Sequence, residues 1–307
     1  MATLAQDPSG ALSRWATYFR ERFPPAQYAV ALGAFTWATL AYTQAIHGKS
    51  GLPGAYSFLV AFAVTFLLFL QLRILDEFKD YREDAQYRPY RPVPRGLVTL
   101  KSLARLWVIG AAIQLVLAAS LGTRPIAMLL LILAYSGLMR VEFFVRDWLK
   151  AHALVYMGSH MLIVPMIAAF IAACSSEAHT VAELAAFLGF SYLNFSVFEL
   201  GRKIWAPHEE RTGVETYSAL WGLRRAVWAW LAAMWGAAAL GLLAAQRAGI
   251  AVPYAAMAVV LATIAAVMAV RFFSDLSRAK GNTFRLASAV WLLGVHITFG
   301  AAIALGA

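Results

Sequence analysis

The sequence is poor in charged residues and has a single cysteine. Asp, Glu, Lys and Arg make up 14% of its 307 residues, whereas soluble domains contain about 25%. So few charges cannot cover the surface of a soluble protein of this length. The lone Cys174 cannot form an intramolecular disulfide, and the sequence has no Cys/His cluster with the spacing of zinc ligands. We therefore exclude a soluble protein, and also disulfide and zinc chemistry.

Apolar residues are abundant instead, at 61% of the chain. Runs of about 17–25 such residues are long enough to cross a bilayer as a helix. They recur from end to end without a long polar domain between them, so residues 1–307 are predicted to form one all-α polytopic membrane domain. Nine spans are predicted, near residues 28–47, 55–75, 103–121, 125–140, 152–173, 181–200, 226–246, 251–271 and 287–305.

Basic residues are distributed unevenly between the connections. With the N-terminus in the cytoplasm, all 26 Lys and Arg residues except Lys49, Arg124 and Arg247 lie on the cytoplasmic side, as the positive-inside rule requires. Nine spans then place the C-terminus outside. The net charge of +10 is interpreted as an orientation signal, so no nucleic-acid partner is predicted. We recognise no signal peptide or transit segment, and we expect the plasma (inner) membrane of a prokaryote.

A cluster of carboxylates follows the second predicted span. Asp76, Asp80 and Asp84 are spaced by four, so they share one face of a helix that continues this span, and Glu77 lies beside them. Like charges at this spacing destabilise a helix, so we expect a cation among them. Mg²⁺ takes oxygen ligands and commonly bridges one or two carboxylates to substrate phosphates. The alternative is a solvated helix end that is neutralised by nearby basic residues.

Three arginines stand directly downstream in the proline-rich segment RPYRPVPRG. They are Arg88, Arg91 and Arg95. Guanidinium groups bind phosphate through paired hydrogen bonds. Carboxylates for a metal ion followed by rigidly held arginines are the two parts needed to hold a diphosphate. Binding of these arginines to the anionic head groups of membrane lipids is the alternative.

This pattern resembles the first signature of the UbiA-type intramembrane prenyltransferase superfamily. That signature runs Asn-Asp-x-x-Asp-x-x-x-Asp and then Arg-Pro-Leu-Pro-x-Gly. Asp76 stands at the Asn and Glu77 at the first Asp, while Asp80 and Asp84 fall on metal-binding aspartates and Arg91 falls on the Arg-Pro. The resemblance implies that Glu77, Asp80 and Asp84 bind Mg²⁺, that Asp76 contacts the substrate, and that Arg91 neutralises the diphosphate.

The family's second signature, after the sixth span, is present only in part. Its Gly-x-x-Thr tail matches residues 213–216, but its two aspartates correspond to Trp205 and Glu209. Glu209 can bind a metal ion, whereas Trp205 cannot. A second metal ion bound as in the family would therefore lack one of its two aspartates here.

Other charged residues near this signature are candidates to replace the missing aspartate. Glu199 and Glu210 are the candidate metal ligands, and Lys203 and Arg202 are candidates to bind diphosphate oxygens directly. A charged residue at a membrane boundary is costly unless it has a partner or a function. An exposed charged loop is the alternative.

Further candidates for substrate binding come from the resemblance and from polar residues inside spans. Tyr135 and Arg140 match part of a family Tyr-Ser/Pro-x-x-Lys-Arg motif, and Arg22 precedes the first span. These arginines can equally be orientation signals. Tyr156, His160 and Asn194 are predicted within spans, where interhelical hydrogen bonds are the alternative to a catalytic role. Phe198 and neighbouring aromatic residues either stabilise an allylic cation or pack in the core.

These features predict magnesium-dependent transfer of an isoprenoid group from a polyprenyl diphosphate to a lipophilic acceptor, aromatic or otherwise, at the cytoplasmic face. A terpene cyclase on the same scaffold is one alternative, because it would need the same diphosphate site. A transporter or lipid-binding membrane protein is another, although no pair of interrupted spans forms an inverted repeat. The Asp-Gly-x-x-Ala-Arg motif of CDP-alcohol phosphotransferases is absent.

Overall fold

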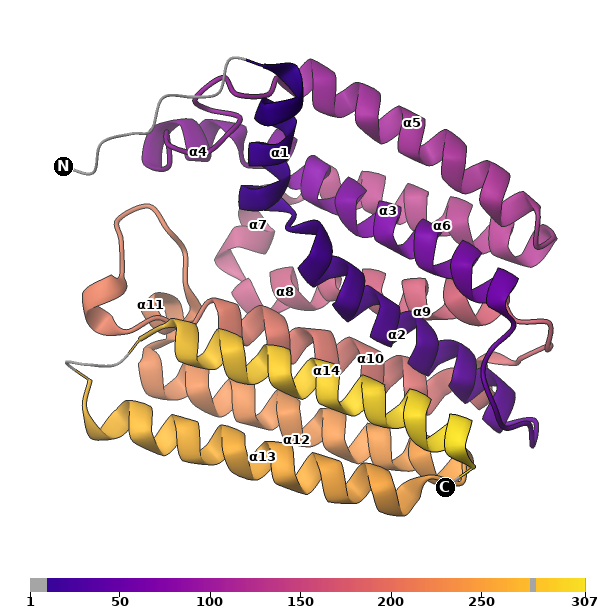
Figure 1. The fold of residues 1–307 in the computed structure, drawn as a ribbon. Coiled ribbons are helices and arrows are strands. Elements are labelled where there is room, and N and C mark those ends of the chain that lie inside the picture. Colours follow the sequence, from indigo (N-terminus) through magenta and orange to yellow (C-terminus); the bar gives the residue numbers. More distant parts are fainter. Residues whose placement is uncertain (1–9, 277–279, 307) are drawn as a thin grey trace.

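Long antiparallel helices make up most of the chain (Figure 1). The computed structural model describes residues 10–276 and 280–306, and within these ranges it contains no β-strand. The long helices are α2 (Pro25–Ala45), α3 (Ala55–Lys79), α5 (Leu100–Ala119), α6 (Thr123–Arg140), α10 (Val181–Arg202), α12 (Leu223–Arg247), α13 (Ala251–Ser274) and α14 (Asn282–Leu305). The shorter ones are α1 (Ala11–Arg22), α4 (Tyr81–Tyr87), η1 (Glu142–Phe144), α7 (Arg146–Ala151), α8 (Ala153–Met161), α9 (Ile163–Ala173), η2 (Pro207–Glu209) and α11 (Tyr217–Trp221).

Every predicted span is helical, and the all-α polytopic fold is confirmed. Within the described ranges, eight segments are long and apolar enough to cross a membrane: α3, α5, α6, α8 with α9, α10, α12, α13 and α14. The first predicted span is the 21-residue helix α2, which is not among the eight. Its Thr, Tyr and Gln residues lower its hydropathy. It packs against α3, α9 and α14.

One span is interrupted near its middle. The predicted span 152–173 consists of α8 and α9, which meet at Leu162. Pro165 has no N–H to donate to the carbonyl group of Met161, and its ring collides with that group in a regular helix. The proline therefore explains why α8 ends at Met161.

Two main clusters of buried side chains hold the helices together. One joins α10, α12, α13 and α14, and the other joins α3, α5, α6 and α9. Helix α2 contributes to both clusters, with Tyr42 in the first and Phe35 in the second. In Figure 1 the two groups of helices lie on either side of α2. The buried interior therefore continues from one half of the bundle to the other along this helix.

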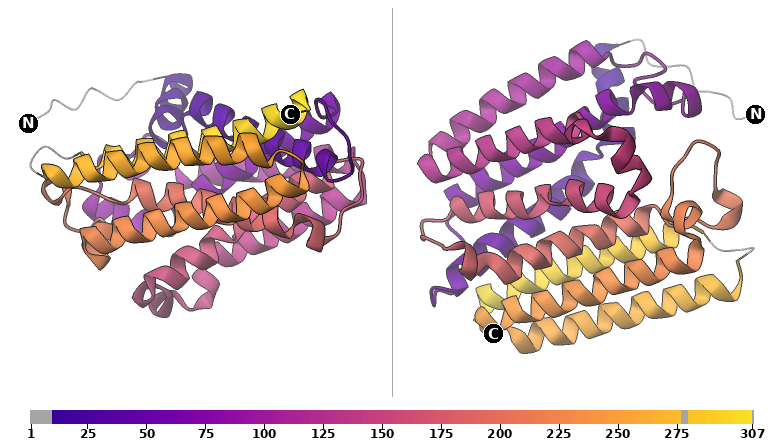
Figure 2. Two further views of the ribbon diagram at one scale, coloured as in Figure 1. Left: turned by 90° about the horizontal axis from the view of Figure 1, so that it is seen from below. Right: turned by 180° about the vertical axis from the view of Figure 1, so that it is seen from behind.

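The short helices gather at one end of the bundle. Figures 1 and 2 show α1, α4, α7 and α11 at this end, together with the connections from α3 to α5, from α6 to α8 and from α10 to α12. We call it the charged end, because both predicted acidic segments, near residues 76–84 and 199–215, lie there. The fold thus brings segments from the two halves of the sequence to the same place.

Candidate functional site

The first acidic segment contains a kink at Asp80. This residue has φ −92° and ψ 2°, and it separates α3 from α4. The expectation of one unbroken helix through this segment is therefore wrong. Hydrogen bonds still link Asp80 N–H to the Asp76 carbonyl (2.9 Å) and Asp84 N–H to the Asp80 carbonyl (2.8 Å). The four-residue register of the three aspartates survives the kink.

Asp84 is 1% exposed and forms ion pairs with two arginines. Nη1 of Arg91 donates to both carboxylate oxygens, at 2.8 and 2.6 Å, and Nε of Arg88 lies 3.2 Å from Oδ1. A series of turns holds this segment in place, including the hydrogen bond from Leu97 N–H to the Pro92 carbonyl (2.8 Å). The predicted metal ligand and the predicted diphosphate ligand therefore neutralise each other in this structure.

Glu77 also has a partner. Nε of Arg22 donates to its Oε1 at 2.5 Å, and the Glu77 side chain is 1% exposed. This ion pair joins α1 to α3. Arg22 and Glu77, which the sequence predicted as a substrate-binding residue and a metal ligand, therefore form an ion pair with each other.

Asp76 and Asp80 are the least engaged carboxylates of the segment. Asp76 is 39% exposed, with Arg73 and Lys79 each 3.6 Å away. Asp80 forms no ion pair within the part of the chain that the structure describes. Burial raises the pKa of Asp80 above its ordinary value; Lys79 opposes this shift, while Asp76 and Asp84 add to it. These two carboxylates are available to a cation.

The end of α10 lies at the same end of the bundle as the end of α3 (Figure 1). Glu199 accepts a hydrogen bond from Nη2 of Arg202 at 2.8 Å and lies 3.3 Å from Nζ of Lys203. Arg202 is also close enough to Asp76 for the two charges to interact. Nζ of Lys203 lies 5.3 Å from the centre of the Tyr217 ring. Arg202 therefore links the two charged segments electrostatically, while Lys203 contacts residues of its own segment.

The other two acids of the second segment are bound within their own region. Glu209 accepts a hydrogen bond from Gly281 N–H, 2.5 Å away, at the start of α14. Glu210 accepts hydrogen bonds from the hydroxyl groups of Thr216 (2.7 Å) and Ser218 (2.6 Å). No group of three or more His, Cys, Asp or Glu residues in the described ranges is arranged to hold a metal ion.

A polar network joins four elements, α3, α8, η1 and α7, at the charged end. Nζ of Lys79 donates to Oη of Tyr156 (2.9 Å), which donates to Oε1 of Glu142 (3.0 Å). Glu142 is buried, and Arg146 lies 2.9 Å from its other oxygen. Residues 142–144 all have positive φ, between 50° and 62°, a conformation that costs non-glycine residues free energy. Tyr156 was predicted as a substrate-binding residue, whereas Glu142 was not, although an acidic residue directly after a span was a usable signal.

The remaining candidates near the fourth and fifth spans contact neighbouring helices. Tyr135 donates to the Ser159 carbonyl at 2.6 Å, and the guanidinium group of Arg140 lies 5.3 Å from the centre of the Phe78 ring. His160 stacks on Tyr156 with ring centres 4.3 Å apart. These contacts hold α6 and α8 beside the charged end.

Aromatic side chains line the interior next to α10. Phe195 lies 5.0 Å from Phe35 and 5.8 Å from Phe69, measured between ring centres. Asn194 is buried beside them, and Phe198 is half-buried one turn nearer the charged end. An apolar chain that enters from the charged end would therefore meet aromatic rings.

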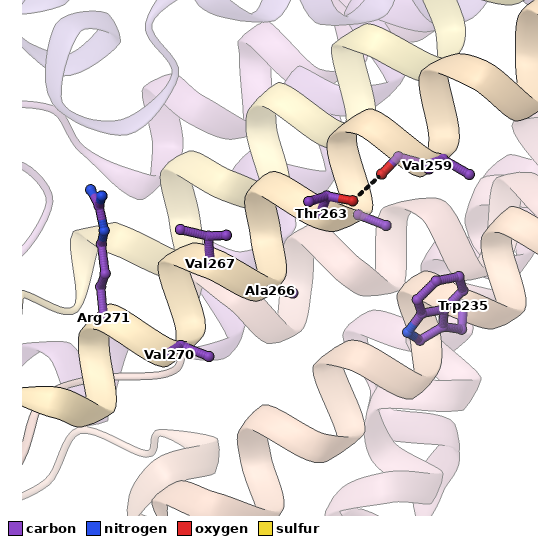
Figure 3. A pocket seen from close by; sticks show the side chains of 8 residues that line it. Trp235, Val259, Thr263, Ala266, Val267, Val270 and Arg271 are labelled. Carbon is purple, nitrogen blue, oxygen red and sulfur yellow. Dashed lines mark hydrogen bonds between the residues drawn. The ribbon is translucent and has the colours of Figure 1, made fainter.

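A hollow of about 470 Å³ lies elsewhere, between α12 and α13 (Figure 3). Its lining includes Trp235, Val259 and Val270, whose side chains are exposed on membrane-length helices. It contains none of the residues of the charged end. We assign it to the lipid-facing surface.

The fold and the charged end define an integral membrane protein of many helices, with its ionisable groups concentrated at one end of the bundle. A model of the UbiA prenyltransferase family matches residues 31–294, and the chain belongs to this family. No curated protein matches the chain.

Solved structures of UbiA homologues share the fold. The apo structure of a homologue from Aeropyrum pernix K1 is 18% identical, with a TM-score of 0.63, and the match covers 90% of this chain and 97% of that one. A structure concerned with digeranylgeranylglyceryl phosphate synthase in membranes is 13% identical (TM-score 0.62, 95% and 99% covered). An Archaeoglobus fulgidus homologue bound to GPP and Mg²⁺ is 11% identical (TM-score 0.57, 91% and 99% covered).

Proposed function

We propose that this protein transfers an isoprenoid group from a polyprenyl diphosphate to a lipophilic acceptor within the membrane, with the help of Mg²⁺. The observation that carries the proposal is that both charged segments lie at one end of the bundle (Figure 1), where Arg202 is near enough to Asp76 for the two charges to interact. Membership of the UbiA prenyltransferase family supports the reaction class. The complex of the A. fulgidus homologue with GPP and Mg²⁺ supports the choice of substrate and ion.

Asp76 and Asp80 fit a magnesium ion. They lie one helical turn apart, and neither is held by a short ion pair. Mg²⁺ typically binds one or two protein carboxylates together with substrate phosphates and water, so a group of three acids is not required. When bound, the ion would neutralise charge on the leaving diphosphate. Asp84, Glu77, Glu199, Glu209 and Glu210 would join it only after release from the partners described above.

The basic residues of both segments would bind the diphosphate. Arg202 and Lys203 come from α10, and Arg91 comes from the turns after α4. Cleavage of the allylic carbon–oxygen bond would leave a cation near the aromatic rings of Phe195 and Phe198. The apolar interior would exclude water that otherwise captures this cation. We place this site at the cytoplasmic face of a prokaryotic plasma membrane, on the distribution of Lys and Arg.

Release of pyrophosphate by the detergent-purified protein tests the proposal. Geranyl, farnesyl and geranylgeranyl diphosphate are supplied with Mg²⁺, with and without a membrane lipid extract as the acceptor source. Release that requires both Mg²⁺ and the extract is the expected result. Release without the extract, giving a product made only of isoprenoid carbons, would identify a cyclase. Folded protein that releases no pyrophosphate would contradict the proposal, and transport of an unchanged ligand would then be examined.

Variants of α3 and α4 sharpen this test. Asp80→Asn should lower the rate at least about 100-fold while leaving the melting temperature unchanged, because Asp80 forms no ion pair among the described residues. Glu83→Gln is the matched control: it removes a nearby carboxylate that pairs with Lys150 rather than with the proposed ion. Equal rates for Asp80→Asn and the wild type would exclude the assigned metal site.

A further inference from the structure

The hollow between α12 and α13 is lined by small side chains. Ala262, Thr263 and Ala266 line it on α13, and Trp235 of α12, which is 60% exposed, lines it from the other helix (Figure 3). The hydroxyl group of Thr263 donates to a backbone carbonyl group of its own helix at 2.8 Å. The lining is therefore apolar apart from one guanidinium group, that of Arg271. An apolar chain can fill such a hollow without leaving a polar group unsatisfied.

The hollow extends over half of α13. Its lining on this helix begins at Val259 and ends at Arg271, twelve residues later, in a helix of 24 residues. At 1.5 Å per residue this distance is about 18 Å, and one leaflet contributes about 15 Å of hydrocarbon to a bilayer. Figure 3 shows Arg271 at one end of this row of side chains. The hollow therefore has the length of an acyl chain in one leaflet, with Arg271 at the level of the head group.

Positive charge gathers at the same level. The two helices are antiparallel, so α12 begins at the end of the bundle where α13 ends (Figure 1). The first turn of α12 carries Arg224 and Arg225, both exposed, and the last turn of α13 carries Arg271. Arg271 forms no ion pair with any residue that the structure describes, and Asp275 is the one acidic residue in the sequence from 223 to 276. Three arginines against one carboxylate attract an anionic head group.

A second copy of the chain fits the hollow less well than a lipid. Small residues four positions apart, such as Ala262 and Ala266, also suit close packing between membrane helices. The two copies of a membrane dimer share one orientation, however, so their two-fold axis brings the same end of α13 together from each copy. Arg271 would then lie close to its counterpart, and like charges repel. The phosphate group of an anionic lipid has the opposite charge and meets no such repulsion.

We propose that the hollow between α12 and α13 binds an anionic phospholipid of the leaflet that surrounds the last turns of α13. One acyl chain lies along Ala262 and Ala266 and contacts Trp235, and the phosphate group pairs with Arg271. None of these residues belongs to the candidate diphosphate site, so the proposal does not depend on prenyl transfer. The bound lipid fills the space that the small side chains leave between the two helices.

Fluorescence quenching by a brominated lipid tests the site. Phosphatidylglycerol with a dibrominated acyl chain is titrated into the delipidated protein in detergent, and phosphatidylcholine with the same chains is the comparison without net charge. Bromine quenches tryptophan on contact. The chain has ten tryptophans, so each titration is repeated with Trp235→Phe, and the difference isolates Trp235. The wild type should bind phosphatidylglycerol about fivefold more tightly, the effect of one basic residue near an anionic lipid.

Two pairs of variants separate the head group from the acyl chain. Arg271→Gln should abolish the preference for phosphatidylglycerol. Arg285→Gln removes an exposed arginine outside the lining, near the start of the adjacent helix α14, and should leave the preference intact. Ala266→Phe fills the hollow and should weaken the binding of both lipids about tenfold. Ala256→Phe places the same side chain at an exposed position of α13 outside the lining and should not weaken it.

Equal affinities of the wild type for the two lipids would overturn the proposal, and so would equal effects of Arg271→Gln and Arg285→Gln, which would indicate unspecific attraction to a basic surface. Quenching that is the same with and without Trp235 would place the lipid elsewhere. Light scattering on the same preparations should give the same oligomeric state for the wild type and Ala266→Phe. A dimer that Ala266→Phe dissociates would show that a second copy covers the hollow, and the lipid site would be refuted.

Discussion

Tyr156 connects two charged side chains through its hydroxyl group. That group accepts a hydrogen bond from Lys79 and donates one to Glu142. Both ends are further neutralised, Lys79 by Asp76 and Glu142 by Arg146. A continuous line of paired groups therefore runs from the candidate magnesium ligands on α3 to α7. These hydrogen bonds and ion pairs fix the position of the Lys79 side chain next to Asp76.

Loss of the Tyr156 hydroxyl group should destabilise the protein. Tyr156→Phe leaves a lysine and a carboxylate without one partner each, and we expect a loss of about 1–3 kcal/mol in the free energy of unfolding. Tyr192→Phe is the matched control, because the Tyr192 hydroxyl makes one long hydrogen bond, 3.3 Å to the Gly158 carbonyl. Thermal unfolding in the same detergent compares them. A smaller effect for Tyr156→Phe than for Tyr192→Phe would contradict the network.

The sequence located the charged residues but not their partners. Spacing along one helix placed Asp76, Asp80 and Asp84 in register, and this register holds through the kink. The partner of Glu77, by contrast, is 55 residues away, and that of Glu209 is 72 residues away. Such pairs depend on how the helices pack, which no spacing reveals. The roles of the predicted site residues stay predictions for this reason.

The crossing of α10 and α14 depends on a residue without a side chain. A Cβ atom on Gly201 would lie 2.7 Å from the Phe284 carbonyl oxygen and would collide with Oγ of Ser288. That serine accepts a hydrogen bond from Trp230 and donates to the carbonyl group of Phe284 (2.8 Å), with the Val197 carbonyl oxygen 3.1 Å away as the alternative acceptor. The helices can approach this closely only because the position is glycine.

Gly201→Ala should therefore separate the two helices. We expect a loss of about 1–3 kcal/mol in stability, since a backbone carbonyl cannot move aside cheaply. Gly137→Ala on α6 is the control, because nothing lies within 4 Å of its added Cβ, and it should gain about 0.5–1 kcal/mol from helix propensity. Equal melting temperatures for the two variants would argue against the close crossing.

The contact between α4 and α7 should depend on pH. Glu83 pairs with Lys150 and Arg146, and the hydrogen bond from Lys150 is the main reason that the pKa of Glu83 lies below its ordinary value. A carboxyl group whose pKa is lowered by folding stabilises the folded state at pH values above its ordinary pKa, which is about 4.3 for Glu. This stabilisation is lost as the pH falls through the lowered pKa. The melting temperatures of wild type and Glu83→Gln should differ at pH 6, and the difference should shrink as the pH falls below the ordinary pKa. A difference that does not shrink with falling pH would show another cause.

Hydropathy predicted the long helices well. All nine predicted spans are helices, with ends displaced by a few residues. The break at Leu162 was missed, although Pro165 stood in the sequence, because hydropathy averages over a window and does not respond to one residue. The short helices α7 and α11 were missed too, and α4 was expected only as an unbroken continuation of α3, because none of these short helices has an apolar period of its own.

The distribution of basic residues predicts which end of the bundle faces the cytoplasm. Ser50→Cys and Thr212→Cys place exposed thiols at opposite ends, while the native Cys174 is 2% exposed and should react little. In spheroplasts, a membrane-impermeant maleimide should label Ser50→Cys at once and Thr212→Cys only after permeabilisation. The protein without an introduced cysteine, which has only Cys174, measures the background labelling. The reverse pattern would place the N-terminus outside.

At the scale of the whole chain, the fold is retained while most residues differ. The Aeropyrum pernix homologue shares 18% of its residues with this chain over 90% of the length. Apolar helices tolerate such change, because one large hydrophobic side chain packs much like another. Trp205 stands where the family's second signature has an aspartate, and Arg202 and Lys203 precede it in the sequence.

The packing of α2 against α14 sets an order of assembly. These two helices contain the first and the last predicted spans, and they lie side by side along the bundle. During synthesis, α2 leaves the ribosome more than two hundred residues before α14. The face of α2 that contacts α14 in the folded bundle is therefore first exposed to lipid or to an insertion factor. Phe299 on α14 then meets Tyr42 on α2. This contact forms only after α14 has entered the membrane, and until then the interior along α2 is open on the side that α14 covers.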